Sequence, residues 1–165
     1  SVGTRKESTA EHSWSAMLLA DYFLTTKEMK LDKLKVFQLL LYHDLHEIKT
    51  GDYGLEPGVK HVNKEQEEAQ AQKKYAEKLP NPFGDYYFSL VKEYEEQSTR
   101  EARFAKAIDA FDAQLHEVDY KEDWKGWSRA FLENKKGPII AEFPELDEQF
   151  QHLLHYLEEE GFFDQ

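Results

Sequence analysis

The chain has 165 residues and a formal net charge of −12, with 40% hydrophobic residues, 14% aromatic residues and no Cys. This length suits one domain with a substantial core, here expected over residues 1–165, and the composition excludes a disordered chain. Phosphate backbones are bound by clustered Lys and Arg, so the acidic balance argues against a nucleic-acid polymer as partner. No apolar run is long enough to span a membrane and no secretory leader is visible, so we expect no membrane association and a cytoplasmic protein.

Apolar residues recur at helical spacing along most of the chain, which predicts an all-α fold. The apolar run 36–42 could also be a buried strand, but its length and its charged flanks favour a buried central helix. Glycines and a proline predict a loop over about 49–62, and Ser98 to Glu101 form a capping-box pattern at a helix start. Helices are expected, in chain order, over residues 11–24, 33–48, 63–79, 84–96, 98–119 and 145–159, with a further segment at 122–135.

Two short strings stand out because they place polar side chains next to apolar helical segments. They are Ala10-Glu11-His12-Ser13-Trp14 and His43-Asp44-Leu45-His46-Glu47, and Asp109 lies in a third apolar segment. Burying a carboxylate without a partner is costly, and a metal ion is an efficient partner. Imidazole nitrogen with carboxylate oxygen suits Mn, Co, Fe, Ni or Zn, with Mg also possible. The sequence therefore predicts one divalent ion and metal-dependent hydrolysis.

The spacing within the second string limits how its residues can act together. His43 and Asp44 are consecutive, so on a helix they point about 100° apart and can both reach one ion only near the helix end or from a shared flank. Glu47 follows within one turn on the same side, where it could orient water or exchange a proton. Taken singly, each residue has an ordinary alternative: His12 could cap a helix, Glu47 could lie at the surface and Asp109 could pair with a Lys or Arg. It is much less plausible that all of these alternatives are true at once.

The order His, His-Asp, Asp resembles that of the HD-domain phosphohydrolases, and the likeness extends beyond these residues. Residues 5–13 resemble the opening segment of the family, and residues 43–52 resemble its His-Asp-x-x-Glu-x-x-x-Gly-Asp core. Residues 59–63 and 105–110 are similar to the bacterial 5′-deoxynucleotidase branch, which acts on deoxynucleoside monophosphates. The resemblance covers about residues 5–120 and implies a single-domain helical bundle of the HD type.

The resemblance also implies roles for individual residues. The metal ligands would be His12, His43, Asp44 and Asp109. Glu47 would act in the proton and water network at the phosphate, and Asp52 would lie on the substrate side. The branch carries an Arg-Trp pair on an earlier helix, and this sequence contains no counterpart of it. We therefore expect activity on both deoxy- and ribonucleoside monophosphates, with the deoxy form preferred by less than ~100-fold.

Other residues near the motifs could contact substrate or support the ligands. Arg5, Lys60 and His61 are candidates for phosphate binding, and Asp112 could orient a ligand one turn from Asp109. We expect His46 beside the ligands or at the surface. The remaining histidines His116, His152 and His155 are expected to be ordinary helix residues.

Several aromatic residues near the end of the chain bear on oligomeric state. Trp124 and Trp127 are expected in core or dimer packing in preference to base stacking. The number of apolar residues that look exposed is high for an acidic monomer. This predicts a homodimer, as in the branch that the chain resembles. These residues are Trp124, Trp127, Phe131, Phe162 and Phe163.

The function expected from the sequence is hydrolysis of (deoxy)nucleoside 5′-monophosphates to nucleoside and phosphate by a metal-dependent phosphomonoesterase. One alternative is another HD-type phosphohydrolase, either a phosphodiesterase or a nucleotide pyrophosphohydrolase. A second alternative is a non-catalytic module that binds nucleotide. A complete ligand set together with Glu47 argues against that module, because binding alone does not require them.

Overall fold

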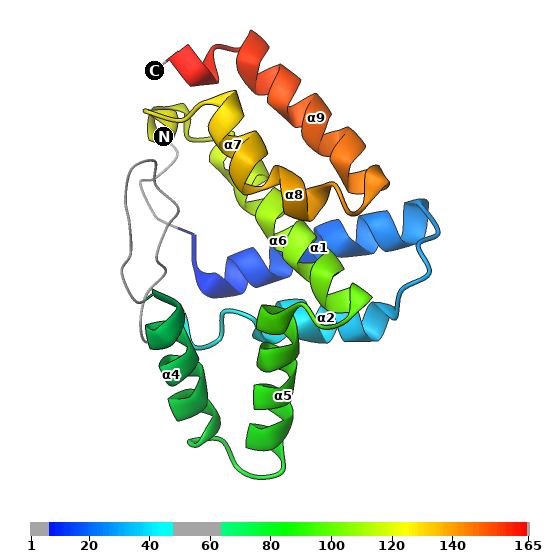
Figure 1. The fold of residues 1–165 in the computed structure, drawn as a ribbon, viewed down its shortest axis with the longest axis vertical. Coiled ribbons are helices and arrows are strands. Elements are labelled where there is room, and N and C mark those ends of the chain that lie inside the picture. Colours follow the sequence, from blue (N-terminus) through cyan, green and yellow to red (C-terminus); the bar gives the residue numbers. More distant parts are fainter. Residues whose placement is uncertain (1–6, 48–63, 165) are drawn as a thin grey trace.

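A computed structural model describes residues 7–47 and 64–164, and every regular element within these ranges is a helix (Figure 1). The predicted all-α fold class is confirmed. None of the described helices is long and apolar enough to cross a membrane. The α-helices are α1 (Thr9–Thr26), α2 (Lys33–Tyr42), α4 (Lys64–Ala76), α5 (Phe83–Glu96), α6 (Arg100–Glu117), α7 (Arg129–Lys135), α8 (Gly137–Ile140) and α9 (Pro144–Glu159), with 3-10 helices at Lys121–Trp124 and Phe162–Asp164.

Helix α1 begins with a capping box that the sequence contains at Ser8 and Glu11. The Ser8 hydroxyl accepts from the Glu11 N–H, and the Glu11 carboxylate accepts from the Ser8 N–H at 2.9 Å. This arrangement satisfies backbone donors that a helix start leaves open, and it places His12 in the first turn. Several large apolar residues of this helix lie outward. Their side chains are exposed, with Trp14 at 63%, Leu18 at 50% and Tyr22 at 56%, while small residues such as Ala16 and Ala20 are buried.

Helix α2 is shorter than predicted and ends at Tyr42, so the prediction of helix through residue 48 is wrong for residues 43–46. His43 is the C-cap, and its N–H still donates to the Leu39 carbonyl at 3.0 Å. The next bonds tighten to three-residue spacing, from Leu45 N–H to Tyr42 O and from Glu47 N–H to Asp44 O. The turn removes the constraint that a regular helix places on adjacent side chains. Residue 48 and the predicted loop at 49–62 lie outside the described residues.

Helices α4 and α5 form an antiparallel pair on one side of the molecule (Figure 1). They approach closely at Gly84, where an added Cβ atom would lie 2.6 Å from the Ala76 carbonyl oxygen. A glycine is therefore required by space at this crossing and not by backbone conformation. The pair supports the centre of the fold, because α5 also contacts α2 and α6.

Helix α6 is the element around which the fold is organised, and it contacts α1, α2, α5, α8 and α9. Its N-cap is Thr99, whose hydroxyl accepts from the Ala102 N–H, so the capping box expected at Ser98 is wrong by one residue. Glu101 instead accepts from the Asp32 N–H at 3.1 Å, which ties the start of α6 to the start of α2. The buried face of α6 carries Phe104, Ile108 and Phe111.

The predicted segment at 122–135 consists of two elements, a 3-10 turn followed by α7, and α8 follows directly. The Trp124 indole donates to the Glu117 carbonyl at 2.8 Å and closes the end of α6. The aromatic residues proposed to form an exposed dimer patch are not exposed: Trp124 is 1%, Trp127 7% and Phe162 5% accessible. Phe131 and Phe163 are half-buried against the same core. The expectation of core packing for the tryptophans is confirmed, whereas the exposed patch is wrong.

Candidate metal centre

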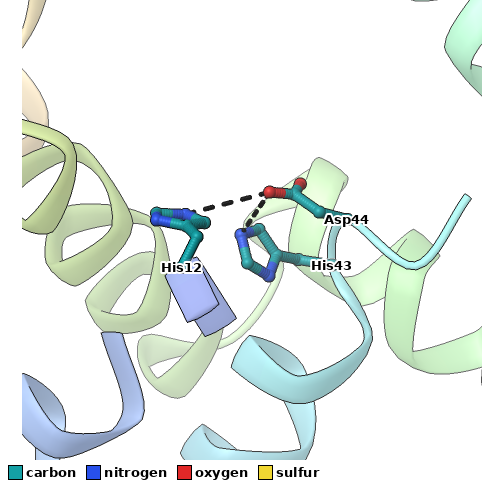
Figure 2. Close-up of side chains that lie close together, drawn as sticks. All are labelled: His12, His43 and Asp44. Carbon is teal, nitrogen blue, oxygen red and sulfur yellow. Dashed lines mark ion pairs between the residues drawn. The ribbon is translucent and has the colours of Figure 1, made fainter. Parts of the chain in front are cut away.

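Side chains from three helices converge where the end of α2 meets the first turn of α1 and the middle of α6. Donor atoms of His12, His43 and Asp44 all lie within 4.8 Å of one another (Figure 2). Asp109 Oδ1 lies 3.0 Å from His12 Nε2 and 3.8 Å from His43 Nε2. Asp44 Oδ2 lies 2.9 Å from His43 Nε2 and 3.8 Å from His12 Nε2. The four residues expected to be ligands are thus brought together, although their sequence positions span most of the described chain.

His43 is held by the main chain of its own helix. Its Nδ1–H donates to the Leu40 carbonyl at 2.8 Å, which fixes the ring orientation and leaves Nε2 directed at the carboxylates. The ring is 1% exposed, and Nε2 has no hydrogen bond of normal geometry even though Asp44 lies beside it. A buried nitrogen of this kind is suited to a metal ion, because an unpaired polar atom is costly in the interior.

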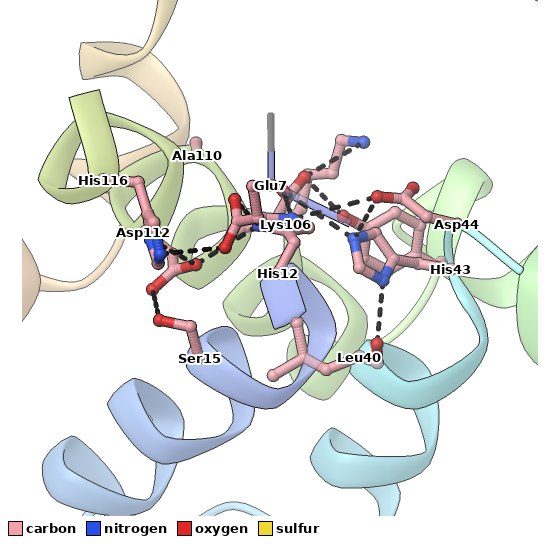
Figure 3. Close-up of polar contacts among 12 residues, drawn as sticks. Glu7, His12, Ser15, Leu40, His43, Asp44, Lys106, Ala110, Asp112 and His116 are labelled. Atoms are coloured by element: carbon pink, nitrogen blue, oxygen red, sulfur yellow. Dashed lines mark hydrogen bonds and ion pairs between the residues drawn. The ribbon is translucent and has the colours of Figure 1, made fainter. Parts of the chain in front are cut away.

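His12 is held by side chains. Its Nε2–H donates to Asp109, while its Nδ1 lies 3.2 Å from Asp112 Oδ2 (Figure 3). Asp112 is 2% exposed and its other oxygen accepts from the Ser15 hydroxyl at 2.8 Å. The prediction that Asp112 could orient a ligand fits this contact, since Asp112 meets His12 on the side of the ring away from Asp44 and Asp109.

The contacts continue from His12 toward the surface through residues that the sequence did not single out for function. His116 Nε2 lies 2.8 Å from Glu7 Oε1, and its other nitrogen lies 3.9 Å from Asp112 Oδ2. Glu7 itself is 4.0 Å from His12 Nδ1. Of the three histidines expected to be ordinary helix residues, His116 therefore differs. The signal was its spacing, because it lies one helical turn after Asp112.

The carboxylates favour protonated imidazoles in the metal-free protein. Burial disfavours the imidazolium of His12, but hydrogen bonds to Asp109 and Asp112 outweigh it and raise the pKa to about 11. Burial likewise opposes the charge on His43, and Asp44 and Asp109 raise its pKa to about 10. The histidines in turn hold the pKa of Asp109 well below its usual value, against the effect of burial. A metal ion would have to displace these protons, so binding should release them.

Asp109 is shared between the cluster and a second pair of residues. Its Oδ2 accepts from the Tyr94 hydroxyl at 2.7 Å, and Lys106 Nζ lies 3.7 Å from the same oxygen. The Lys106 ammonium also lies over the Tyr94 ring, 4.5 Å from its centre. Lys106 lies in the segment 105–110 that resembles the family, but the sequence predicted no role for it. Tyr94 lies on a neighbouring helix and belongs to none of the motifs.

The donor set fits a divalent ion. It combines two imidazole nitrogens with two carboxylate oxygens, a mixture that suits first-row ions from Mn to Zn. Two carboxylates also balance the charge of a divalent ion, and the buried His43 nitrogen provides a ligand that is already oriented.

Glu47 lies directly beyond the turn, with its N–H bonded to the Asp44 carbonyl at 2.9 Å and its side chain half-buried. His46 is 4% exposed, so a surface position is wrong, and burial lowers its pKa and favours the neutral ring. The other predicted site residues lie outside the described residues. They are Asp52 and the candidates for substrate contact Arg5, Lys60 and His61.

Comparison with known proteins identifies the family. A model of the HD domain matches residues 1–147. The chain belongs to the HD domain family. It is 29% identical over 148 residues to the 5′-deoxynucleotidase HDDC2 of Bos taurus, covering 90% of this chain and 66% of that protein. It is 27% identical over 148 residues to the Homo sapiens protein of the same name, and that match covers 90% of this chain and 67% of that protein. The chain thus spans about two thirds of the length of these relatives.

A solved structure is also similar, that of a predicted metal-dependent phosphohydrolase from Magnetospirillum magnetotacticum MS-1. The TM-score is 0.84 at 29% identity, and the match covers 96% of this chain and 81% of that one. The resemblance expected from the sequence is confirmed, and so is the class of protein, a metal-dependent phosphohydrolase of the HD family.

Proposed function

We propose that the protein is a phosphomonoesterase that hydrolyses nucleoside 5′-monophosphates to nucleoside and phosphate. The observation that carries this proposal is the convergence of two imidazoles and two carboxylates at the end of α2, in a chain similar to proteins named 5′-deoxynucleotidase. One divalent transition-metal ion is proposed as cofactor, held by His12, His43, Asp44 and Asp109. Such an ion would offer positive charge to phosphoryl oxygens and lower the pKa of a nearby water.

The residues of the chain itself would orient the metal ligands and transfer protons. The turn after α2 fixes the direction of His43 and Asp44, and Asp112 holds His12 in one orientation. Glu47 is proposed to take the proton of the attacking water or to give one to the leaving oxygen. Asp52 is proposed to lie on the substrate side. The net charge of −12 means that attraction of a nucleotide depends on local positive groups rather than on the overall field.

A substrate panel tests the reaction. Phosphate release is measured with Mn²⁺, Co²⁺ or Mg²⁺ on matched deoxy- and ribonucleoside monophosphates, beginning with dAMP and AMP. We expect turnover of the monophosphates and a ratio of kcat/KM between the two sugars of less than ~100-fold. Turnover of a phosphodiester, or release of pyrophosphate or triphosphate from nucleoside triphosphates in place of monophosphate turnover, would assign one of the other HD activities. Nucleotide binding without any turnover would identify a binding module.

The proposed role of Glu47 has its own test. Glu47→Gln should lower phosphate release by at least ~10²-fold, as for other lost acid–base groups, while the Kd for Mn²⁺ stays close to that of the unmodified protein. The reason is that Glu47 lies beyond the ligand cluster and is not needed to hold the ion. Unchanged turnover would remove Glu47 from the mechanism, and a large loss of metal affinity would make it a ligand.

The homodimer and the cytoplasmic location also stay predictions. Because the C-terminal aromatics are in the core, the apolar residues available for self-association are other exposed side chains of the described residues, among them Trp14, Leu18 and Tyr22 on α1. Light scattering at micromolar protein measures the mass directly, and a monomer would contradict the dimer.

A further inference from the structure

Lys106 is a positive charge at the edge of an acidic cluster, with no role in the ligand set. It precedes Asp109 by one helical turn on α6, so the two side chains share a face. Its Nζ lies 3.7 Å from Asp109 Oδ2, which is an ion pair but too long for a direct hydrogen bond. In the part of the chain that the structure describes, this ammonium donates no hydrogen bond, and the side chain is 30% exposed. No described residue therefore uses its three N–H donors.

Asp109 does not depend on Lys106 for its hydrogen bonds. Oδ1 faces His12, and Oδ2 already accepts from the Tyr94 hydroxyl at 2.7 Å. The Tyr94 ring lies beneath the ammonium at 4.5 Å, a contact that holds a cation without using its donors. Tyr94 thus fixes both neighbours, and the Lys106 side chain extends past the cluster toward the side on which Asp44 lies (Figure 3).

The balance of charge shows what such a cation can bind. Two carboxylates offset a divalent ion, so the loaded ligand set is neutral and Lys106 adds one positive charge beside it. Asp109 already lies between the ammonium and the ion, so the one remaining positive charge would attract a further anion such as a phosphoryl group. A lysine ammonium carries its positive charge at neutral pH.

We propose that Lys106 is a phosphate-binding residue whose ammonium donates hydrogen bonds to a phosphoryl oxygen beside the metal centre. It would hold the phosphoryl group of the substrate and then the inorganic phosphate product. This inference rests on the proposed function in one respect only, that the substrate is a phosphate monoester. Among described residues, Lys106 is the only Lys or Arg that forms an ion pair with a proposed ligand.

The test measures metal binding and phosphate binding separately. Lys106→Met keeps the length of the side chain and removes its charge, Lys106→Arg keeps the charge, and Lys92→Met is the matched control. Lys92 is on α5, is 60% exposed and pairs with Glu96. Titration calorimetry gives the Kd for Mn²⁺ and then the Kd of the Mn²⁺-loaded protein for inorganic phosphate. A charged hydrogen bond of typical strength predicts that Lys106→Met weakens phosphate binding by ~10- to 100-fold.

Metal affinity distinguishes phosphate binding from a structural role. Removing a positive charge beside Asp109 should leave the Kd for Mn²⁺ unchanged or tighter, and Lys106→Arg should recover part of the phosphate affinity. Phosphate affinity equal to that of Lys92→Met would overturn the proposal, and so would an equal loss of metal and phosphate affinity. If Lys106 controls phosphate binding but no nucleotide is hydrolysed, the proposed function fails alone. If nucleotides are hydrolysed and Lys106→Met binds phosphate normally, the inference fails alone.

Discussion

The two imidazoles at the centre of the site are held in different ways. On the α2 side, the His43 ring is fixed by a main-chain carbonyl within its own helix end. On the α1 side, the His12 ring is fixed by the carboxylates of Asp109 and Asp112, both of which belong to α6. One orientation is therefore a consequence of local backbone structure, while the other requires that α1 and α6 pack correctly against each other.

This difference determines what substitution can do to each side. The Leu40 carbonyl cannot be removed by changing a side chain, so the orientation of His43 is robust as long as α2 ends where it does. The orientation of His12 can be altered at Asp112, at Ser15 or further out at His116. The α1 side is where the affinity for a metal ion can be tuned without touching a ligand.

The largest effect is expected where the two sides meet, at Asp109. Asp109→Asn keeps the shape of the side chain but removes the charge that faces both rings. We expect the Kd for Mn²⁺ to rise by more than ~100-fold, which exceeds the usual cost of losing a group that only supports a ligand. Calorimetric titration measures it. Asp119→Asn, an exposed position beyond the end of α6, is the control for charge, and an effect of equal size there would refute a ligand role for Asp109.

A smaller effect is expected at Asp112, which touches only the α1 side. Asp112→Ala should weaken Mn²⁺ binding by ~10- to 100-fold because the His12 ring loses the acceptor that orients it. Asp112→Asn keeps an oxygen acceptor and should recover much of the affinity. Ser15→Ala leaves the carboxylate in place and should change the affinity for Mn²⁺ less than either substitution of Asp112. An affinity unaffected by Asp112→Ala would mean that packing alone orients His12, as the backbone does for His43.

The protonation of the two rings gives a prediction for pH. Both pKa values are raised above the ordinary 6.5, to about 11 for His12 and about 10 for His43, so the folded metal-free protein binds protons more tightly than the unfolded chain. Their stabilising contribution is complete below pH 6.5 and is lost as pH rises toward 10–11. Metal binding displaces the same protons, so the stabilisation by added Mn²⁺ should increase with pH.

Melting temperatures measured with and without Mn²⁺ from pH 6.5 upward check both predictions, the fall in stability of the metal-free protein and the increasing stabilisation by Mn²⁺. Asp109→Asn is the internal comparison, because without this carboxylate the pKa of each histidine falls and the slope of the metal-free protein should flatten. A metal-free protein whose stability rises over this range would contradict the assigned protonation.

The sequence could predict the ligands but not what holds them. His12, His43, Asp44 and Asp109 stand in an order that a family pattern recognises, and helical periodicity predicted most of the fold. The end of α2 was misplaced because the sequence has no glycine or proline between Tyr42 and Gly51, whereas the three-residue bonds of the turn end the helix earlier. Tyr94, Lys106, Glu7 and His116 were missed because their contacts join separate helices or continue a chain of side chains outward. The exposure of Trp14, Leu18 and Tyr22 on α1 could not be predicted either, since periodicity shows that a face exists and not which way it points.

The smallest effect is expected at the outer end of the α1 side, and it tests how far the support of His12 extends. His116 is 40% exposed, is 3.9 Å from Asp112 Oδ2, and pairs with Glu7 at 2.8 Å. Exposed pairs of this kind contribute little, so His116→Ala should change the Kd for Mn²⁺ by less than ~5-fold. His155→Ala, an exposed i,i+4 pair on α9, is the matched control. A loss at His116 as large as that of Asp112→Ala would show that the orientation of His12 depends on the whole set of contacts out to the surface. A loss no larger than the control would confine that support to Asp112, where burial makes a single carboxylate sufficient.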